Sequence, residues 1–154
     1  MLRQREAEEE DLVRAEDEAE VALLAVRVLP ALLGGEGPRR YFLAVQQPAE
    51  LRGSGGIIGS YGELTAVDGD LDVATFGRDS ELNSAAAANA ATLDGAPAEY
   101  IARYGRFTPE RIWQNVSMSP HFPHVAKTIE VLYPRSGGEA VDGVVSVTPR
   151  ALAS

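Results

Sequence analysis

The dipeptide Asp68-Gly69 constrains the fold of this chain more than any other feature. It lies between two apolar runs of strand length, residues 57–67 and 71–76. An Asp-Gly pair supplies the two positive φ angles of a type I′ turn, whose twist matches that of two adjacent antiparallel strands. The sequence therefore predicts a β-hairpin and excludes an all-helical fold.

The position of the turn also sets which residues of the hairpin lie opposite each other. With the two turn residues unpaired, Leu64 faces Val73 on an apolar face, and Tyr61 faces Phe76 on the other, half-polar face. A register shift of one residue would exchange the two faces, because side chains alternate along a strand. The register is therefore a specific prediction.

The rest of the chain alternates between strand and helix patterns. Apolar runs at residues 41–45 and 144–147 have the length of strands, and helical patterns lie between them at residues 98–104 and 125–133. Thr148-Pro149 is typical of a helix start, since threonine caps free N–H groups and proline fits the first turn. We therefore expect an α/β fold with a central mixed sheet that contains the hairpin and is flanked by helices.

The beginning of the chain differs in composition from the rest. Residues 1–20 hold nine acidic and three basic side chains, and the spacing of apolar residues predicts one helix over residues 4–28. Glycines and a proline at residues 34–38 then end this helix. We expect a stalk-like, acidic amphipathic helix over residues 1–29 and an α/β domain over residues 30–154. The final helix start, so near Ser154, implies a domain that is incomplete at its C-terminus.

Composition excludes several classes of function. The chain has no cysteine, which excludes disulfide scaffolds and thiolate chemistry. Its net charge of −9 disfavours nucleic-acid binding, which depends on neutralising phosphates. The chain itself has no secretory signal and no apolar run of the ~20 residues that cross a bilayer. Thirteen of the 14 basic residues are arginines, and Lys127 is the one lysine. This preference for arginine is typical of GC-rich bacterial genomes, so we expect anions to be bound by arginine or backbone amides.

Charged residues and glycines gather at the predicted ends of two strands. Glu50 and Arg52 enter a glycine-rich loop, and the Arg78-Asp79 pair follows the second strand of the hairpin. The paired N–H groups of an arginine guanidinium and the backbone N–H groups of glycines are suited to binding phosphate or pyrophosphate. Carboxylates are suited to binding Mg²⁺. The predicted anion-binding residues are Arg52, Arg78, Gly53, Gly55 and Gly56, and the predicted magnesium ligands are Glu50 and Asp79. The alternative is that these charged residues form salt bridges and caps around a turn.

Other motifs lack the spacing that their chemistry needs. The loop at residues 53–59 has neither the third glycine of a dinucleotide-binding loop nor the lysine of a Walker loop. His121 and His124 offer two imidazoles, but Pro120 and Pro123 break the helix that would align them, and no thiolate joins them. We therefore expect no zinc site.

An ordered set of short motifs resembles one protein family from about residue 30 to the C-terminus. The motifs include Gly37-Pro-Arg-Arg-Tyr41, Gly55-Gly-Ile-Ile-Gly-Ser-Tyr-Gly62, Trp113-Gln-Asn115 and Ser119-Pro-His-Phe-Pro123. Together they are similar to the actinobacterial-type family known as domain of unknown function 4012. Its members carry a transmembrane helix upstream of a helical stalk, so the resemblance implies an extracytoplasmic, membrane-anchored protein. It implies no particular activity.

A more distant resemblance bears on chemistry. The order of strand, arginine-containing loop, hairpin, Arg-Asp pair and asparagine-bearing loop is similar to LytR-CpsA-Psr proteins. These are bacterial phosphotransferases that transfer polyprenyl-pyrophosphate-linked glycopolymers to the cell wall. The resemblance implies a partial domain of that type, in which Arg52, Arg78 and Asn115 bind pyrophosphate and Asp79 holds magnesium. It does not cover the whole magnesium site, because the segment from Gly53 to Gly56 stands in place of the aspartate expected after the first arginine.

Three functions follow as hypotheses. The first is an extracytoplasmic envelope domain that binds a cell-wall polymer, a lipid-pyrophosphate glycan or a protein partner without catalysis. The alternative is a phosphotransferase-like enzyme that transfers a polyprenyl-pyrophosphate-linked glycopolymer. The third is a structural or assembly module without a small-molecule site. Convergence of Arg52, Arg78 and Asn115 on one groove favours the first two, and separate salt bridges favour the third.

Overall fold

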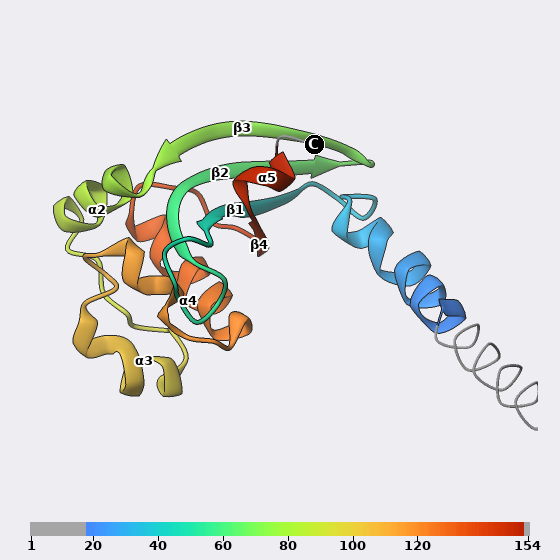
Figure 1. Cartoon of the computed structure of the whole chain (residues 1–154). Coiled ribbons are helices and arrows are strands. Elements are labelled where there is room, and N and C mark those ends of the chain that lie inside the picture. The colour runs from blue at the N-terminus through green and yellow to red at the C-terminus, as the bar shows by residue number, and fades with distance from the viewer. Residues whose placement is uncertain (1–17, 153–154) are drawn as a thin grey trace, which may run out of the picture. The chain divides into compact units, whose positions relative to one another are not determined.

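The computed structural model describes residues 18–152 (Figure 1). A helix over residues 18–32 comes first. The elements that follow are β1 (Arg39–Gln47), β2 (Ile57–Val67), β3 (Asp70–Arg78), α2 (Asp79–Ala88), α3 (Ala98–Tyr104), the 3₁₀ helices η1 (Gly105–Phe107) and η2 (Trp113–Met118), α4 (Phe122–Arg135), β4 (Gly143–Val147) and α5 (Pro149–Leu152). Within the described residues, one compact unit holds 18–38 and 66–70, and a second holds 39–65 and 71–152.

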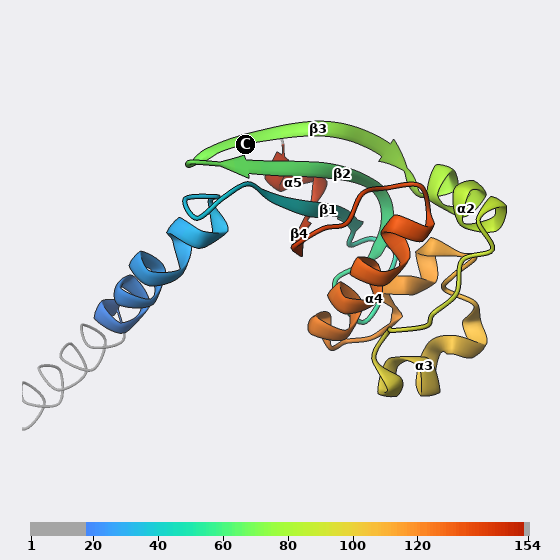
Figure 2. The same ribbon diagram turned by 180° about the vertical axis from the view of Figure 1, so that it is seen from behind.

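The predicted α/β fold with a mixed sheet is confirmed. The strand order is β3-β2-β1-β4, and β1 and β4 run parallel, from Tyr41 opposite Gly143 to Val45 opposite Val147. The tight turn between β2 and β3 makes that pair antiparallel. Figures 1 and 2 show α3 and α4 below the sheet and α2 beside the end of β3, with α5 apart from them. Helix α4 packs against β4 and η2, whereas α5 touches β1.

The turn of the hairpin forms where the sequence predicts it. Asp68 and Gly69 have φ angles of 50° and 92°, both in the left-handed region that a type I′ turn requires. Near the turn, the Oγ1 hydroxyl of Thr65 donates to the carbonyl oxygen of Asp72 at 3.4 Å. The predicted register places these two residues opposite each other, so this contact agrees with it.

Farther from the turn, the pairing differs from the prediction. A methyl group on Gly62 would lie 3.3 Å from Cδ2 of Phe76, so the side chain of Phe76 lies on the Gly62 side of the hairpin. A methyl group on Gly77 would lie 2.7 Å from the ring of Tyr61, so Gly77, and not Phe76, faces Tyr61. One extra residue in β3, a β-bulge, accounts for both contacts.

The half-polar face of β2 is the face packed against the helices. Tyr61 and Glu63 of that face are buried, whereas Leu71 and Val73 of the apolar face are 56% and 49% exposed. The buried carboxylate of Glu63 is paired on both oxygens. It accepts a hydrogen bond from the Tyr133 hydroxyl at 3.0 Å and forms a 3.2 Å ion pair with Arg40. These partners make burial of the acid tolerable.

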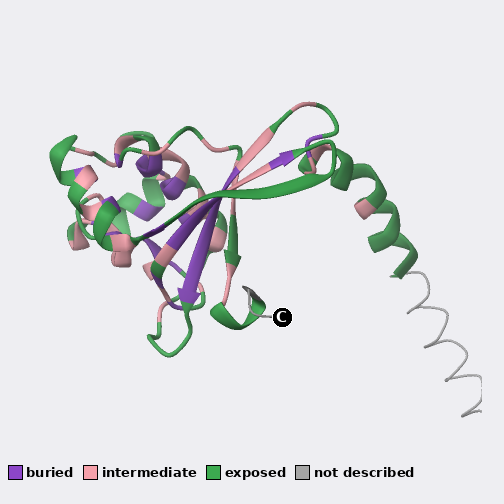
Figure 3. Cartoon of the chain, turned by 90° about the horizontal axis from the view of Figure 1, so that it is seen from above, coloured by how far each residue is buried: buried purple, intermediate pink, exposed green. Residues whose placement is uncertain are grey.

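Phe42 of β1 is the centre of the core between the sheet and the helices. Its ring centroid lies 5.5 Å from that of Tyr61, 5.6 Å from Trp113 and 4.9 Å from Tyr133. The buried indole N–H of Trp113 donates to Ser136 Oγ at 3.1 Å. Figure 3 shows the buried residues concentrated along the strands and on the inner sides of the helices. The core therefore joins β1 and β2 to α4 and η2.

The first helix ends later than predicted. It continues through Pro30 to residue 32, whereas the part predicted over residues 4–17 lies outside the described residues. A proline removes one helical hydrogen bond, and this one lies within a turn of the helix end. Gly34, with φ of 78°, then stops the helix, and the N–H of Gly35 bonds to the carbonyl of Pro30 at 2.8 Å. The predicted glycine stop is therefore confirmed.

Helices of the second unit are more extensive than predicted. The predicted helix over 98–104 is confirmed, and α4 begins three residues before the predicted start at 125 because Pro123 fits its first turn. Residues 113–118 form η2, and the alanine-rich stretch of residues 85–91, for which the sequence predicted no element, lies partly in α2. The cap at Thr148 is confirmed, since its hydroxyl accepts from the N–H of Ala151 at 3.4 Å.

The helix over residues 18–32 carries many exposed apolar side chains. Val21, Leu24 and Val26 are 67%, 63% and 71% exposed. Within residues 18–152, no helix has both the length and the apolar character needed to cross a membrane.

Alkaline pH is expected to destabilise the fold. Burial raises the pKa of Tyr100 and Tyr133 well above the ordinary value of about 10, and the hydrogen bond to Glu63 adds to the effect at Tyr133. The folded chain therefore keeps these protons while the unfolded chain loses them. Stability from this source is complete below about pH 10 and falls above it, by up to about 1.4 kcal/mol per pH unit for each tyrosine.

Urea unfolding at a series of pH values from neutral to strongly alkaline measures this effect. The Tyr133→Phe variant should show a shallower loss of stability above about pH 10 than the wild-type protein, because one linked proton is removed. An unfolding free energy that stays constant into the strongly alkaline range would contradict the prediction.

Candidate functional site

The glycine-rich loop before β2 is held against the segment of residues 117–120. A methyl group on Gly53 would lie 2.6 Å from both the Met118 carbonyl oxygen and the Pro120 nitrogen. Ser54 strengthens this contact, because its hydroxyl donates to the carbonyl of Ser117 at 3.1 Å. Only a residue without a Cβ allows such a close approach of two backbones. Packing within the protein thus accounts for the glycine at position 53.

The other two predicted glycines shape the base of the loop. Gly56 has φ of 134°, and a methyl group there would lie 2.3 Å from the carbonyl oxygen of Gln47. The side chain of Gln46 spans the loop by donating to Ser54 Oγ and to the Gly56 carbonyl, both at 3.1 Å. Gly55, with φ of 114°, lies next to the same glutamine side chain. The loop is therefore built by specific contacts at both ends.

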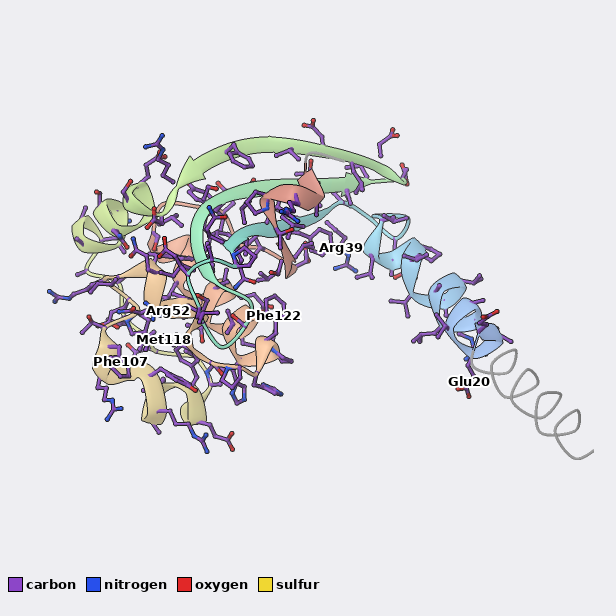
Figure 4. The ribbon with its side chains drawn as sticks, viewed as in Figure 1. Glu20, Arg39, Arg52, Phe107, Met118 and Phe122 are labelled. Carbon is purple, nitrogen blue, oxygen red and sulfur yellow. The ribbon has the colours of Figure 1, made fainter. Side chains whose placement is uncertain are left out.

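This loop brings Arg52 to Asn115. The Nη2 group of Arg52 donates to Asn115 Oδ1 at 3.4 Å, and Asn115 Nδ2 in turn donates to the carbonyl of Phe107 at 2.8 Å. The second bond orients the amide so that its oxygen points to the arginine. Arg52 Nε is buried and has no hydrogen-bond partner within residues 18–152. Figure 4 shows Arg52 in the loop in front of α4.

Asp79 is bound by the residue that precedes Asn115. Gln114 Nε2 donates to Asp79 Oδ2, and Asn83 Nδ2 donates to Gln114 Oε1 at 3.4 Å. Asn83 also accepts from the Trp113 N–H at 2.8 Å, which joins α2 to the start of η2. The Trp-Gln-Asn motif of η2 thus contacts Asp79 through one residue and Arg52 through the next. Gln114 and Asn83 were missed in the sequence, although Gln114 lies inside a motif that the family resemblance marks.

Two predicted site residues have no described contact with this group. Arg78 is exposed at the start of α2, where its N–H donates to Glu81 Oε1 at 3.3 Å. Glu50 is exposed, and its N–H bonds to the Gln47 carbonyl at 3.1 Å. Within residues 18–152, ion pairs involve Arg39, Arg40 and Lys127 with acids other than Glu50 and Asp79. The salt-bridge part of the alternative therefore has no ion pair to support it in this part of the chain, whereas the cap at Arg78 and Glu81 agrees with its other part.

The possible magnesium ligands are few. In the described part of the chain, no three side chains of histidine, aspartate or glutamate come together as a metal site. Mg²⁺ is often held by one or two carboxylates together with water and the phosphates of a ligand. Glu50 and Asp79 would therefore depend on a bound phosphate to complete any magnesium site.

A small cleft that includes residues 119–120 in its lining was not predicted. Its volume is about 270 Å³, and its lining includes Arg103, His121 and His124 as cationic or basic groups and Glu99 as the one acid. The two imidazole rings lie 4.3 Å apart, at the N-terminal end of α4. In the sequence, the spacing of these histidines bears only on zinc binding. Their association with Arg103 on α3 depends on tertiary packing.

Comparison with known proteins agrees with the motif resemblance. The family model described as protein of unknown function DUF4012 matches residues 36–154. This range includes every residue of the loop, η2 and the cleft described above. No curated protein and no solved structure gives a significant match. The chain therefore belongs to the DUF4012 family.

Proposed function

We propose that this protein is an extracytoplasmic domain of the bacterial cell envelope that binds a lipid-pyrophosphate glycan through its pyrophosphate group. The observation that carries the proposal is the meeting of Arg52 and Asn115, which are 63 residues apart in sequence. Their 3.4 Å contact is long, and the buried Nε of Arg52 adds a donor with no partner in the described chain. A guanidinium with spare donors is suited to phosphate oxygens.

The surroundings of this arginine support an anionic ligand. Arg52 takes part in no ion pair within residues 18–152, so its charge is not neutralised by a neighbouring acid there. The cleft with Arg103, His121 and His124 shares residues 119–120 with the contact surface of the loop. The loop that carries Arg52 and the cleft that carries Arg103 thus meet at one short segment. Such a local excess of positive charge favours anions even on a protein whose net charge is −9.

The phosphotransferase alternative has one supporting observation. Asp79, the predicted magnesium ligand, bonds to Gln114, whose neighbour Asn115 contacts Arg52. A carboxylate beside a pyrophosphate would allow Mg²⁺ to bridge the two. We propose catalysis only as the second candidate, because Gly53 to Gly56 stand where the LytR-CpsA-Psr pattern has a further aspartate.

Titration of geranyl pyrophosphate, a short water-soluble polyprenyl pyrophosphate, tests the proposal by calorimetry. Arg52→Ala should weaken binding about tenfold or more, because a charge-assisted hydrogen bond contributes about 1.5–3 kcal/mol and 1.4 kcal/mol is a factor of ten. The affinity of the Arg78→Ala variant for geranyl pyrophosphate determines whether the second predicted arginine belongs to the same site. Mg²⁺ should strengthen binding only modestly, because the described carboxylates are few.

Arg27→Ala is the matched control. It removes the same charge from the exposed helix over residues 18–32, outside the second unit, and should leave the affinity unchanged. Equal binding by the wild-type protein and the Arg52→Ala variant would reject this site. Hydrolysis of geranyl pyrophosphate to geranyl phosphate and inorganic phosphate with Mg²⁺ present, in which water takes the distal phosphoryl group, would favour the phosphotransferase alternative.

A further inference from the structure

A larger cleft lies away from the arginine loop, at the end of α2. Its volume is about 610 Å³ and its walls combine the last turn of α2 with parts of α3, η1 and residues 110–111. Small and apolar side chains form most of the lining, among them Ala87, Ala90, Leu93 and Ile101. A concave apolar surface of this size is suited to a small molecule if a few polar groups orient it.

Two oppositely charged side chains line the same cleft. Glu110 contributes a carboxylate, and Oε2 of this group is buried without a hydrogen-bond partner among the described residues. A buried carboxylate oxygen without a donor is unfavourable, so a ligand that supplies one gains binding free energy. Arg111, the next residue, is exposed and brings a guanidinium to the lining.

The backbone at the cleft also has an unusual conformation. Ala90 lines it with φ of 49°, in the left-handed region that residues other than glycine rarely adopt. Such strained positions occur often at ligand-binding sites. The position follows the end of α2, where the chain turns toward Leu93, and it contributes to the alanine wall of the cleft.

We propose that this cleft binds a small zwitterion of the amino acid type. Its ammonium group pairs with the carboxylate of Glu110, and its carboxylate accepts from Arg111. Its apolar side chain packs on the alanine wall beside Leu93. The charges of the lining favour this class over a simple amine or a simple acid, because Arg111 repels the first and Glu110 repels the second.

Three matched probes test the proposal on the ¹⁵N-labelled full chain by NMR titration. They are L-leucine, its decarboxylated analogue 3-methylbutylamine and its deaminated analogue 4-methylpentanoate. We expect L-leucine to shift the amide signals of Leu93, Ile101 and Gly105, with a millimolar dissociation constant. Either analogue, which lacks one charged group, should bind about tenfold more weakly or not at all.

Variants of the residues that line the cleft distinguish binding of L-leucine in this cleft from nonspecific binding elsewhere on the protein. Glu110→Gln keeps the size of the side chain but removes its charge, and should weaken L-leucine binding about tenfold or more. Ala87→Leu should block binding by filling the cleft without disturbing a charge, which covers the case in which Glu110→Gln fails to fold. Glu36→Gln, in the exposed turn before β1 and outside this cleft, should bind like the wild-type protein.

Several outcomes would overturn the proposal. One is the absence of shifts with millimolar L-leucine, and another is equal affinity for L-leucine and its decarboxylated analogue. Unchanged binding in both Glu110→Gln and Ala87→Leu would also reject it. None of these results bears on pyrophosphate binding, which depends on different residues.

Discussion

Replacement of Phe42 by alanine is expected to lower the free energy of unfolding by about 3–5 kcal/mol, the range typical of a buried phenylalanine. Phe42 is fully buried and its ring contacts Tyr61, Trp113 and Tyr133. Removing it leaves a cavity where the sheet meets α4 and η2, and the aromatic pairs are lost as well. Because a domain of this size is stable by only about 5–15 kcal/mol, the loss is a large fraction of the total.

The exposed Phe76 on the edge strand β3 provides the matched control. It is 60% exposed, so Phe76→Ala makes the same chemical change in the same sheet with little loss of buried area. We expect an effect below about 1 kcal/mol for this variant. Urea unfolding followed by tryptophan fluorescence measures both, since Trp113 is the one tryptophan and contacts Phe42. Similar unfolding midpoints for the two variants would contradict the described core.

Replacement of Gly53 by alanine is expected to separate the arginine loop from η2. The new methyl group would lie 2.6 Å from two backbone atoms, which cannot move as the end of a flexible side chain can. The loop must shift, at a cost of about 1–3 kcal/mol in stability. The shift carries Arg52 away from Asn115, so we expect binding of geranyl pyrophosphate to fall about tenfold or more, as for Arg52→Ala.

Gly59→Ala tests whether the effect is specific to the contact. Gly59 lies on β2, close in sequence to the loop, and a methyl group there would meet no heavy atom within 4 Å. This variant should keep the stability and the affinity of the wild-type protein to within about 0.5 kcal/mol. The described loop contact would be contradicted if Gly53→Ala and Gly59→Ala were indistinguishable in unfolding and in binding.

The candidate site was predicted only in part, because local patterns do not reveal distant contacts. Arg52 and Asp79 were predicted because they are charged residues at strand ends, and Asn115 was predicted because of the resemblance to LytR-CpsA-Psr proteins. The bonds of Gln114 to Asp79 and Asn83 cross 35 and 31 residues of sequence, a separation at which no periodicity carries information. The two clefts are also formed by residues from several elements, so no single motif indicates them.

The sequence by itself determined the local structure of this protein. The turn at Asp68-Gly69, the bounds of β2 and the cap at Thr148 follow from backbone preferences of single residues and their neighbours. Such preferences act over a few bonds and do not need the rest of the fold. The alternation of strands and helices, on the same basis, was enough to predict the α/β class.

Only the tertiary structure decided which face of the hairpin is buried. Tyr61 and Glu63 face the core because Phe42 and Tyr133 supply an aromatic surface and a hydroxyl donor for them. Leu71 and Val73 of the opposite face remain exposed, since none of the helices below the sheet covers that part of β3. Burial depends on the partners that folding brings together, and an acid with a paired carboxylate can be buried where an unpartnered leucine is not.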